Sequence, residues 1–409
     1  MGFNHEVVKV DSIKVVSSVE KLPTTEEQKS SSKVGLNSKD GNQMVHRIIV
    51  GGYAGIISII EFDETIQQLV EMDSLTDSIV GKSPTWITTS HDGKLFYSSN
   101  EVNDIDGKKD TGSISCFRLV ESLQKLESKE KKTLKIEPID RILSSPGGTA
   151  SRHELNSDGT FKSKDKSDQM FSYHATGPHP VRQDHYCMNK PTGQVAAFTD
   201  LGGDRVYFHS VDNQTGELTP IETIELKPGS GPRHLIFFVV NETRTDIYLI
   251  CELSNEILYL EMNQNSTNKS RNIKLKQILS TLPTGVNPED TTFTGGEIEL
   301  SFDGKFLYST TRQTDLKKPT QENSILIFKR DLSNGKLDLN PKELKLNLMG
   351  HTPRHFSFSK DPKQKLMVLA THESNLIGIY SRDEFNGELN LIHLIDVKSL
   401  PTVAQFIPF

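Results

Sequence analysis

A pattern of short strands recurs along this chain and narrows its possible folds more than its length or composition does. Runs of β-branched and aromatic residues, bounded by turn residues, are typical of strands. The runs begin at Ile48, Phe96, Val195, Ile247, Phe306 and Leu366. Successive starts lie 48, 99, 52, 59 and 60 residues apart. Because the second interval is about twice the others, the spacing predicts a further unit near residue 145 and seven units in all.

Each unit contains the turns expected of a four-stranded antiparallel sheet. Tight turns join its first two strands, as in HDGK at 91–94 and FDGK at 302–305. Other turns join the outer pair, as in NQTG at 213–216, SNG at 333–335 and FNG at 385–387. Four strands in a repeat of roughly 50 residues is the period of a β-propeller blade. We therefore predict an all-β fold, a seven-bladed β-propeller with four antiparallel strands per blade.

Two stretches fit this pattern poorly. An α/β fold would need long segments with a helical period of 3.6, and only residues 122–132 approach one. We expect this stretch to be a flexible, charged connection between blades instead. The third unit, between Leu134 and Tyr173, offers an outer hairpin around residues 156–159 but a poor inner strand. We therefore predict a degenerate third blade with a long loop.

The two ends of the chain have different roles. Residues 1–44 are rich in Ser, Lys, Thr, Glu and Asp and lack periodicity, so we predict a mostly disordered extension followed by one propeller domain over 45–409. The apolar stretch 402–409 is predicted to close the ring onto the first blade, since an open propeller would leave unpaired strand edges.

Composition excludes several classes of function. The chain has 47 basic and 54 acidic residues, a net charge of -7, which argues against nucleic-acid binding. It has no charge-free apolar stretch of membrane-spanning length and no signal-peptide pattern, so we expect no membrane association and a cytoplasmic location. Its three cysteines, Cys116, Cys187 and Cys251, lack a CxxC spacing and are predicted to be buried thiols.

Propeller geometry identifies candidate functional residues. The first strand of each blade lines the central channel and the second runs back beside it, so the start of one and the end of the other meet at one rim. The stretch from Gly231 to Asn255 is the clearest case, because Arg233 opens its first strand and Glu252 closes its second. The same stretch also contributes His234, and the other blades contribute Trp86, Asn100, Glu101, His185, Asp200, Glu297, Arg312, Arg354, His355, His372 and Glu373.

This set of rim residues favours an anion-binding site. A single charged residue at a strand end is usually solvated or part of a surface ion pair, and such pairs contribute only about 0–1 kcal/mol. Several charged residues around one funnel are harder to explain without a ligand. The chain has no HxH, HExxH or CxxC motif and its rim contains arginine, so no metal or cofactor is predicted. Arginine pairs favour carboxylate or phosphate, with His185 and Glu252 handling protons.

The rim segments resemble the seven-bladed lactonase propeller family, which includes fungal 3-carboxy-cis,cis-muconate cyclase and bacterial 6-phosphogluconolactonase. The similar segments are MVHRIIVGGYAGIISIIEFDE, HYCMNKPTGQVAAFTDLGGDRV, GPRHLIF with ICELSNEI, and LSFDGKFLYSTTR. The resemblance extends from His46 to Phe409. It implies a catalytic set of His185, Arg233, Glu252 and Arg312. Beside that set, the rim geometry suggests Trp86, Asp200, Arg354 and His355 as substrate-binding residues.

Three functions remain open on this basis. The first is cycloisomerisation of a carboxylated muconate to its lactone, with the arginines holding carboxylates and His185 and Glu252 as acid and base. The second is hydrolysis of 6-phosphogluconolactone or another sugar lactone at the same site. The third is a non-catalytic propeller that binds a small anion or a protein partner. The sequence predicts no oligomeric state.

Overall fold

The computed structural model describes most of the chain after residue 44. It covers residues 45–102, 104–109, 111–126, 129–144, 149–164, 167–173, 185–189, 194–265, 271–317 and 323–408, with side chains undescribed at 123–126, 129–132 and 185–189. The predicted extension, 1–44, lies outside the described residues. Within the described ranges the secondary structure is all strand, with no helix that is long and apolar enough to cross a membrane.

The described strands form six four-stranded sheets, one two-stranded sheet and one short hairpin. The first two blades are β28 (Pro401–Phe406), β1 (Val45–Gly52), β2 (Ile57–Asp63) and β3 (Gln68–Leu75), then β4 (Pro84–Thr89), β5 (Leu95–Asn100), β8 (Ser113–Leu126) and β9 (Lys129–Leu143). The hairpin β6 (Asp104–Ile105) and β7 (Lys108–Lys109) and the two-stranded sheet β10 (Thr149–Arg152) and β11 (Gln169–Ser172) follow.

Four regular blades complete the ring. Blade four has β12 (His185–Asn189), β13 (Val195–Asp200), β14 (Arg205–Val211) and β15 (Leu218–Glu225), and blade five has β16 (Pro232–Val239), β17 (Arg244–Cys251), β18 (Glu256–Gln264) and β19 (Arg271–Ser280). Blade six has β20 (Phe293–Leu300), β21 (Phe306–Gln313), β22 (Ser324–Lys329) and β23 (Lys342–Lys345), and blade seven has β24 (Pro353–Phe358), β25 (Leu366–Thr371), β26 (Leu376–Arg382) and β27 (Leu389–Asp396).

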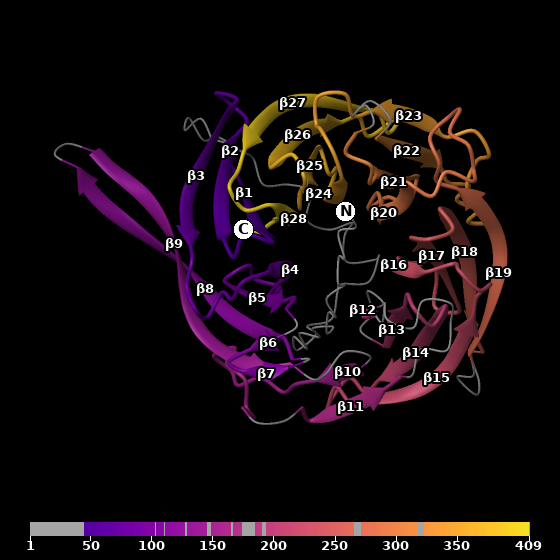
Figure 1. Cartoon of the computed structure of the whole chain (residues 1–409), viewed down its shortest axis with the longest axis horizontal. Helices are drawn as coiled ribbons and strands as arrows, with labels where there is room; N and C mark the ends of the chain where they lie inside the picture. Colours follow the sequence, from indigo (N-terminus) through magenta and orange to yellow (C-terminus); the bar gives the residue numbers. More distant parts are fainter. Residues whose placement is uncertain are drawn as a thin grey trace, which may run out of the picture.

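Figure 1 shows the blades arranged around a central axis, with the first strand of each regular blade innermost. The second strands are almost wholly buried because neighbouring blades cover both of their faces, which explains apolar runs such as LMVLAT without polar alternation. One apolar cluster joins Val368 of β25 to Ile48 and Phe406 of the first blade. Cys116 and Cys251 are buried free thiols, as predicted.

The ring closes as the sequence predicts. β28 forms the innermost strand of the first blade and pairs with β1, with Phe406 opposite Ile48 and Ala404 opposite Val50. The first blade is therefore built from both ends of the propeller. Its three outer strands come from the start of the domain and its inner strand from the end.

The third blade is incomplete within the described residues, as predicted. Its two strands flank a turn at residues 156–159, and the Tyr97 hydroxyl of the preceding blade donates to the Gly159 carbonyl at 2.9 Å. Tyr248 and Tyr308 make the same contact with glycines in the outer turns of the blades that follow them. This repeated tyrosine contact identifies β10 and β11 as the outer pair of blade three.

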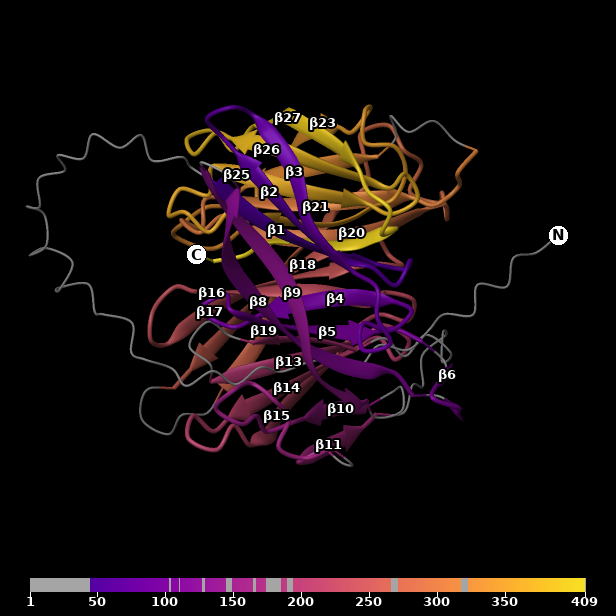
Figure 2. The ribbon, with the colours of Figure 1, turned by 90° about the vertical axis from the view of Figure 1, so that its left-hand side faces the viewer.

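The predicted flexible connection at residues 122–132 is wrong for its described part. Residues 122–126 and 129–132 extend β8 and β9 into a long hairpin that projects from the ring (Figure 1). Figure 2 shows β9 crossing the outside of the molecule beside β3. Antiparallel pairing, from Ser113 opposite Leu143 to Leu126 opposite Lys129, joins these charged strands. The outer strand β9 also reaches Leu143, so residues 134–143 belong to blade two.

Candidate functional site

Four inner strands begin with the same local structure. Proline is the first residue of β4, β16, β24 and β28, where its lack of an N–H removes no ladder hydrogen bond. A register shift follows each proline, so the next residue is bulged out of the pairing. Bulges of this kind redirect a side chain. The four bulged residues, Thr85, Arg233, Arg354 and Thr402, line one small cavity with Trp86, Glu101 and Glu297.

The residues that follow the second strands occupy a second set of equivalent positions. Each donates its backbone N–H to the carbonyl of the residue before the inner-strand proline, at 2.7–3.1 Å. The residues in these positions are Tyr53, Glu101, Glu252 and His372. The predicted convergence at one rim is thus produced by backbone hydrogen bonds that recur from blade to blade.

Glu252 holds two arginines from adjacent blades. Its Oε2 accepts from Nη1 of Arg233 at 3.0 Å and lies 2.8 Å from Nη2 of Arg312. All three side chains are about 95% buried. Backbone carbonyls fix the guanidiniums further, because Arg233 donates to Gly296 and Arg312 donates to Gly295 at 3.0 and 2.9 Å. The structure therefore brings together three of the four residues in the predicted catalytic set.

Replacing Gly295 with alanine is expected to disturb this arrangement. An added Cβ would lie 2.6 Å from the carbonyl oxygen of Cys251, a backbone atom, so β20 would have to move away from β17. Overpacking of this kind costs about 1–3 kcal/mol, and the movement would displace the carbonyl that holds Arg312. We expect a lower melting temperature and a higher KM for an anionic substrate. If the melting temperature and KM of Gly295→Ala both matched those of the wild type, the close approach of Gly295 to Cys251 would have no role.

A second group of charged residues comes from blades seven, one and two. Nη2 of Arg354 donates to the Tyr53 hydroxyl at 2.9 Å, and that hydroxyl donates to Oε2 of Glu101 at 3.3 Å. Burial raises the pKa of Glu101, although the charge of Arg354 opposes this effect. The ring of His372 packs edge-on against Tyr53, with centroids 4.9 Å apart. Burial and the nearby arginines lower the pKa of His372 to about 4, so it is neutral at pH 7.

Trp86 and His355 pack together beside His234 and Glu297, and Trp86 shares the small cavity with Arg233. The Trp86 ring meets the rings of His234 and His355 edge-on, each at a centroid distance of 5.2 Å. Nδ1 of His234 lies 2.6 Å from Oε1 of Glu297, and His355 lies 3.8 Å from the other oxygen. Burial lowers the pKa of His355 to about 4 and also lowers that of His234, so both imidazoles are neutral at pH 7.

His185 and Asp200 lie opposite each other in the β12–β13 register. The His185 side chain lies outside the described residues. Asp200 is fully buried, and its carboxylate accepts from the Gly203 N–H at 2.8 Å and the Tyr207 hydroxyl at 3.4 Å. These contacts stabilise the turn between β13 and β14, which gives Asp200 a structural explanation beside its predicted substrate-binding role.

Three arginines, Arg233, Arg312 and Arg354, lie close enough at the rim to influence one another. Burial, with the charges of Arg233 and Arg354, lowers the pKa of Arg312 to about 10 against the opposing effect of Glu252. Three guanidiniums thus interact at one end of the channel, and a bound anion would offset their repulsion. Among the described residues, no group of three or more His, Cys, Asp or Glu side chains is placed to hold a metal ion.

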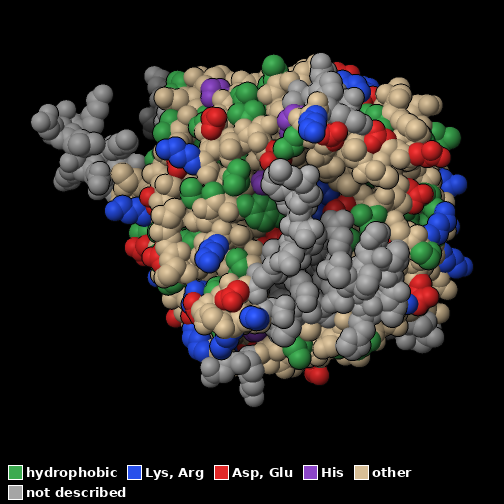
Figure 3. Space-filling view, in the orientation of Figure 1, with side chains coloured by type: hydrophobic (Ala, Val, Ile, Leu, Met, Phe, Trp, Pro, Cys, Tyr) green, Lys and Arg blue, Asp and Glu red, His purple; other side chains and the backbone are tan. Residues whose placement is uncertain are grey.

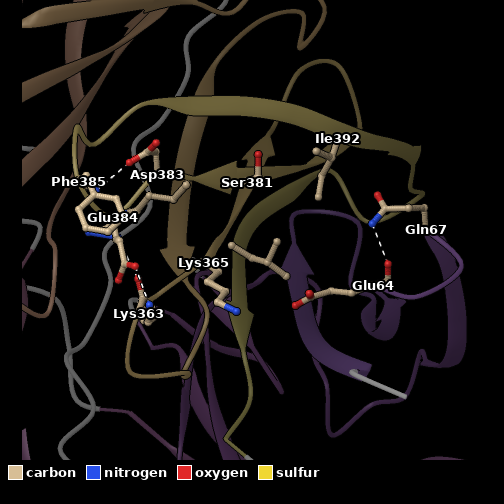
Figure 4. Close-up of a pocket in the computed structure, with 11 residues that line it drawn as sticks. Glu64, Gln67, Lys363, Lys365, Ser381, Asp383, Glu384, Phe385 and Ile392 are labelled. Carbon is tan, nitrogen blue, oxygen red and sulfur yellow. Dashed lines mark hydrogen bonds and ion pairs between the residues drawn. The ribbon is translucent and has the colours of Figure 1, made fainter. Parts of the chain in front are cut away.

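A larger pocket of about 440 Å³ lies between the first and seventh blades (Figure 4). It is lined by residues near the start of β25, whereas His372 follows the other end of that strand. Lys363 is paired there with Glu384 at 2.6 Å. The pocket therefore lies at the opposite end of the strands and offers no arginine cluster comparable to the rim. On the face shown in Figure 3, described basic and acidic side chains are interspersed.

The fold and the arginine-rich rim agree with the comparison against known families. Residues 47–404 match the family described as "Lactonase, 7-bladed beta-propeller". The chain belongs to this family. The resemblance inferred from the rim segments is confirmed, as is the predicted seven-bladed fold.

Named relatives of this lactonase-family chain include two 6-phosphogluconolactonases. A probable 6-phosphogluconolactonase of Arthroderma benhamiae is 28% identical over 351 residues, which cover 83% of each chain. A 6-phosphogluconolactonase of Formosa agariphila is 27% identical over 343 residues, 79% of this chain and 86% of the relative. A solved periplasmic gluconolactonase of Pseudomonas aeruginosa has a TM-score of 0.67 over 89% of this chain and 99% of its own, at 20% identity. At this low identity, the structural similarity is evidence for the fold of this chain alone.

Sequence reasoning missed three residues of the site. Tyr53 links Arg354 to Glu101, while Thr85 and Thr402 line the cavity. The signal was present in the chain, because a proline precedes each bulged residue. Tyr53 could have been found by aligning the ends of the second strands, where it occupies the same position as Glu252.

Proposed function

We propose that this lactonase-family chain hydrolyses a sugar lactone that carries an anionic group, with 6-phosphogluconolactone as the leading candidate. The observation that carries the proposal is the cluster of Arg233, Arg312 and Arg354, whose mutual repulsion contributes to the lowered pKa of Arg312. Planar guanidiniums suit phosphate and carboxylate oxygens. The names of the relatives support lactone hydrolysis over the muconate cycloisomerisation predicted first.

In the proposed reaction, water adds to the lactone carbonyl carbon and the bond from that carbon to the ring oxygen then breaks. Negative charge develops on the carbonyl oxygen, where a fixed guanidinium stabilises it. We assign this role to Arg233, which lines the cavity, and anion binding to Arg312 and Arg354. Because Oε2 of Glu252 lies within 3.0 Å of two guanidiniums, the contacts favour a holding role for Glu252 over the predicted proton transfer.

A substrate panel tests the proposal. Purified protein should hydrolyse 6-phosphogluconolactone above the rate of an enzyme-free blank. It should prefer this substrate to unphosphorylated gluconolactone by about 10- to 100-fold in kcat/KM, because a charge-assisted hydrogen bond contributes about 1.5–3 kcal/mol. Failure to hydrolyse any sugar lactone would refute the proposal. If the protein then converted 3-carboxymuconate, the hypothesis of muconate cycloisomerisation would be supported instead.

A further inference from the structure

Glu101 and Glu252 are equivalent carboxylates with different surroundings. Both follow the second strand of a blade, and both donate a backbone N–H across the blade, at 2.8 and 2.7 Å. Two guanidiniums share one oxygen of Glu252, whereas Glu101 accepts from the uncharged hydroxyl of Tyr53. Where two acidic groups at one site differ in this way, they are suited to different chemical roles. The structure therefore distinguishes Glu252, which pairs with two arginines, from Glu101, which can accept a proton.

The small cavity lies directly against Glu101. Its volume is about 20 Å³, and a space of about 10–15 Å³ is enough for one water molecule. Polar groups surround it, including the side chains of Glu101, Arg233, Arg354 and Glu297. A water molecule needs two to four such partners to be held in place. The cavity thus has the size and polarity of a site for a single water.

We propose that Glu101 is the general base of the hydrolysis and that this cavity holds the attacking water. The inference rests on the lactone hydrolysis proposed above. A carboxylate oxygen of Glu101 takes a proton from the water as the water oxygen bonds to the carbonyl carbon. The carbonyl electrons move onto the oxygen facing Arg233. When the ring C–O bond breaks, Glu101 returns its proton to the departing ring oxygen, so lactone and water give one hydroxy acid.

The charges around Glu101 suit this role. Arg354 of β24 and Arg233 of β16 are the positive groups that face it, Tyr53 contributes the hydroxyl, and Glu297 of β20 is the other carboxylate in the cavity wall. Burial raises the pKa of Glu101 above its ordinary value, and the two arginines limit the rise. A general base works best when its pKa lies nearer to the operating pH than that of a solvated glutamate.

The variant Glu101→Gln tests the assignment through its pH profile. The base must be ionised, so wild-type kcat/KM should rise with pH through the pKa of Glu101 and then level off. In Glu101→Gln we expect kcat to fall by about 10²- to 10³-fold, KM to stay near the wild-type value, and the acidic limb to disappear. The exposed Glu388→Gln is the matched control and should retain the wild-type profile.

The variant Tyr53→Phe gives an independent measurement. It removes the hydroxyl that stabilises the Glu101 carboxylate, so the acidic limb should move to higher pH while the reaction continues. Thermal unfolding of each variant shows whether it is folded. An active wild type with the same acidic limb in Glu101→Gln, or an unmoved limb in Tyr53→Phe, would overturn the inference and leave the proposed function standing. A wild type that hydrolyses no lactone would overturn both.

Discussion

Replacing Arg233 with methionine is expected to lower kcat/KM for 6-phosphogluconolactone by about 10²- to 10³-fold, the usual effect of removing one donor to a developing oxyanion. Methionine is close to arginine in length but carries neither the charge nor the donors. Arg233 also holds Glu252, and its Nε donates to the Gly296 carbonyl at 3.0 Å. Arg233→Lys should recover only part of the loss, because a compact ammonium group lacks the planar fork of donors with which Arg233 reaches both Glu252 and Gly296.

The matched control for this experiment is Lys342→Met. Lys342 is paired with Glu388 at 2.7 Å, and both side chains are more than half exposed. Exposed pairs contribute at most about 1 kcal/mol, so this variant should keep wild-type kinetics. Steady-state kinetics of all three variants, with thermal unfolding beside them, would separate catalysis from stability. Wild-type kcat/KM in a folded Arg233→Met would contradict the assigned role.

The second large effect is expected on stability and far from the rim. Arg330 and Asp246 form an ion pair between blades six and five, with side chains 1% and 0% exposed. Arg330 also donates to the Tyr248 hydroxyl at 2.6 Å and covers the Phe238 ring at 4.5 Å. Arg330→Met leaves the buried Asp246 carboxylate without this partner. Because Arg244 and the Tyr259 hydroxyl, each 2.9 Å from the carboxylate, still partner Asp246, the free energy of unfolding should fall by about 1–3 kcal/mol.

Catalysis should be unaffected by the same change. Asp246 lies near the start of β17 and Glu252 follows its end, so the pair and the rim are separated by about 20 Å at a rise of about 3.4 Å per residue. Urea unfolding and steady-state kinetics of Arg330→Met would check both expectations. Lys363→Met, which removes an exposed pair with Glu384, serves as the stability control. An equal loss of unfolding free energy in Arg330→Met and Lys363→Met would show that burial does not determine the cost of breaking an ion pair.

The sequence predicted most of the fold because its strands are short, regularly spaced and bounded by recognisable turns. Six second strands lie where the apolar runs predicted them, and residues 401–406 close the ring. The long β8–β9 hairpin could not be foreseen in the same way. Its outer part, around residues 122–132, is charged and has no apolar alternation of period two that would predict a strand.

The site was predicted less completely than the fold. Arg233, Glu252 and Arg312 could be placed together because strand direction decides which end of a blade each residue occupies. The depth of a side chain depends on bulges, which spacing alone does not reveal. His355, which follows one such bulge, therefore packs against Trp86 and lies 3.8 Å from Glu297.

Binding of 6-phosphogluconate, the stable product of the proposed reaction, is the most direct test of the claim that the arginine-rich rim receives an anionic sugar acid. Titration calorimetry should show that wild-type protein binds it about 10- to 100-fold more tightly than unphosphorylated gluconate. Arg312→Met should remove this difference. Equal affinity for the two acids in the wild type, or an undiminished preference in Arg312→Met, would contradict the account.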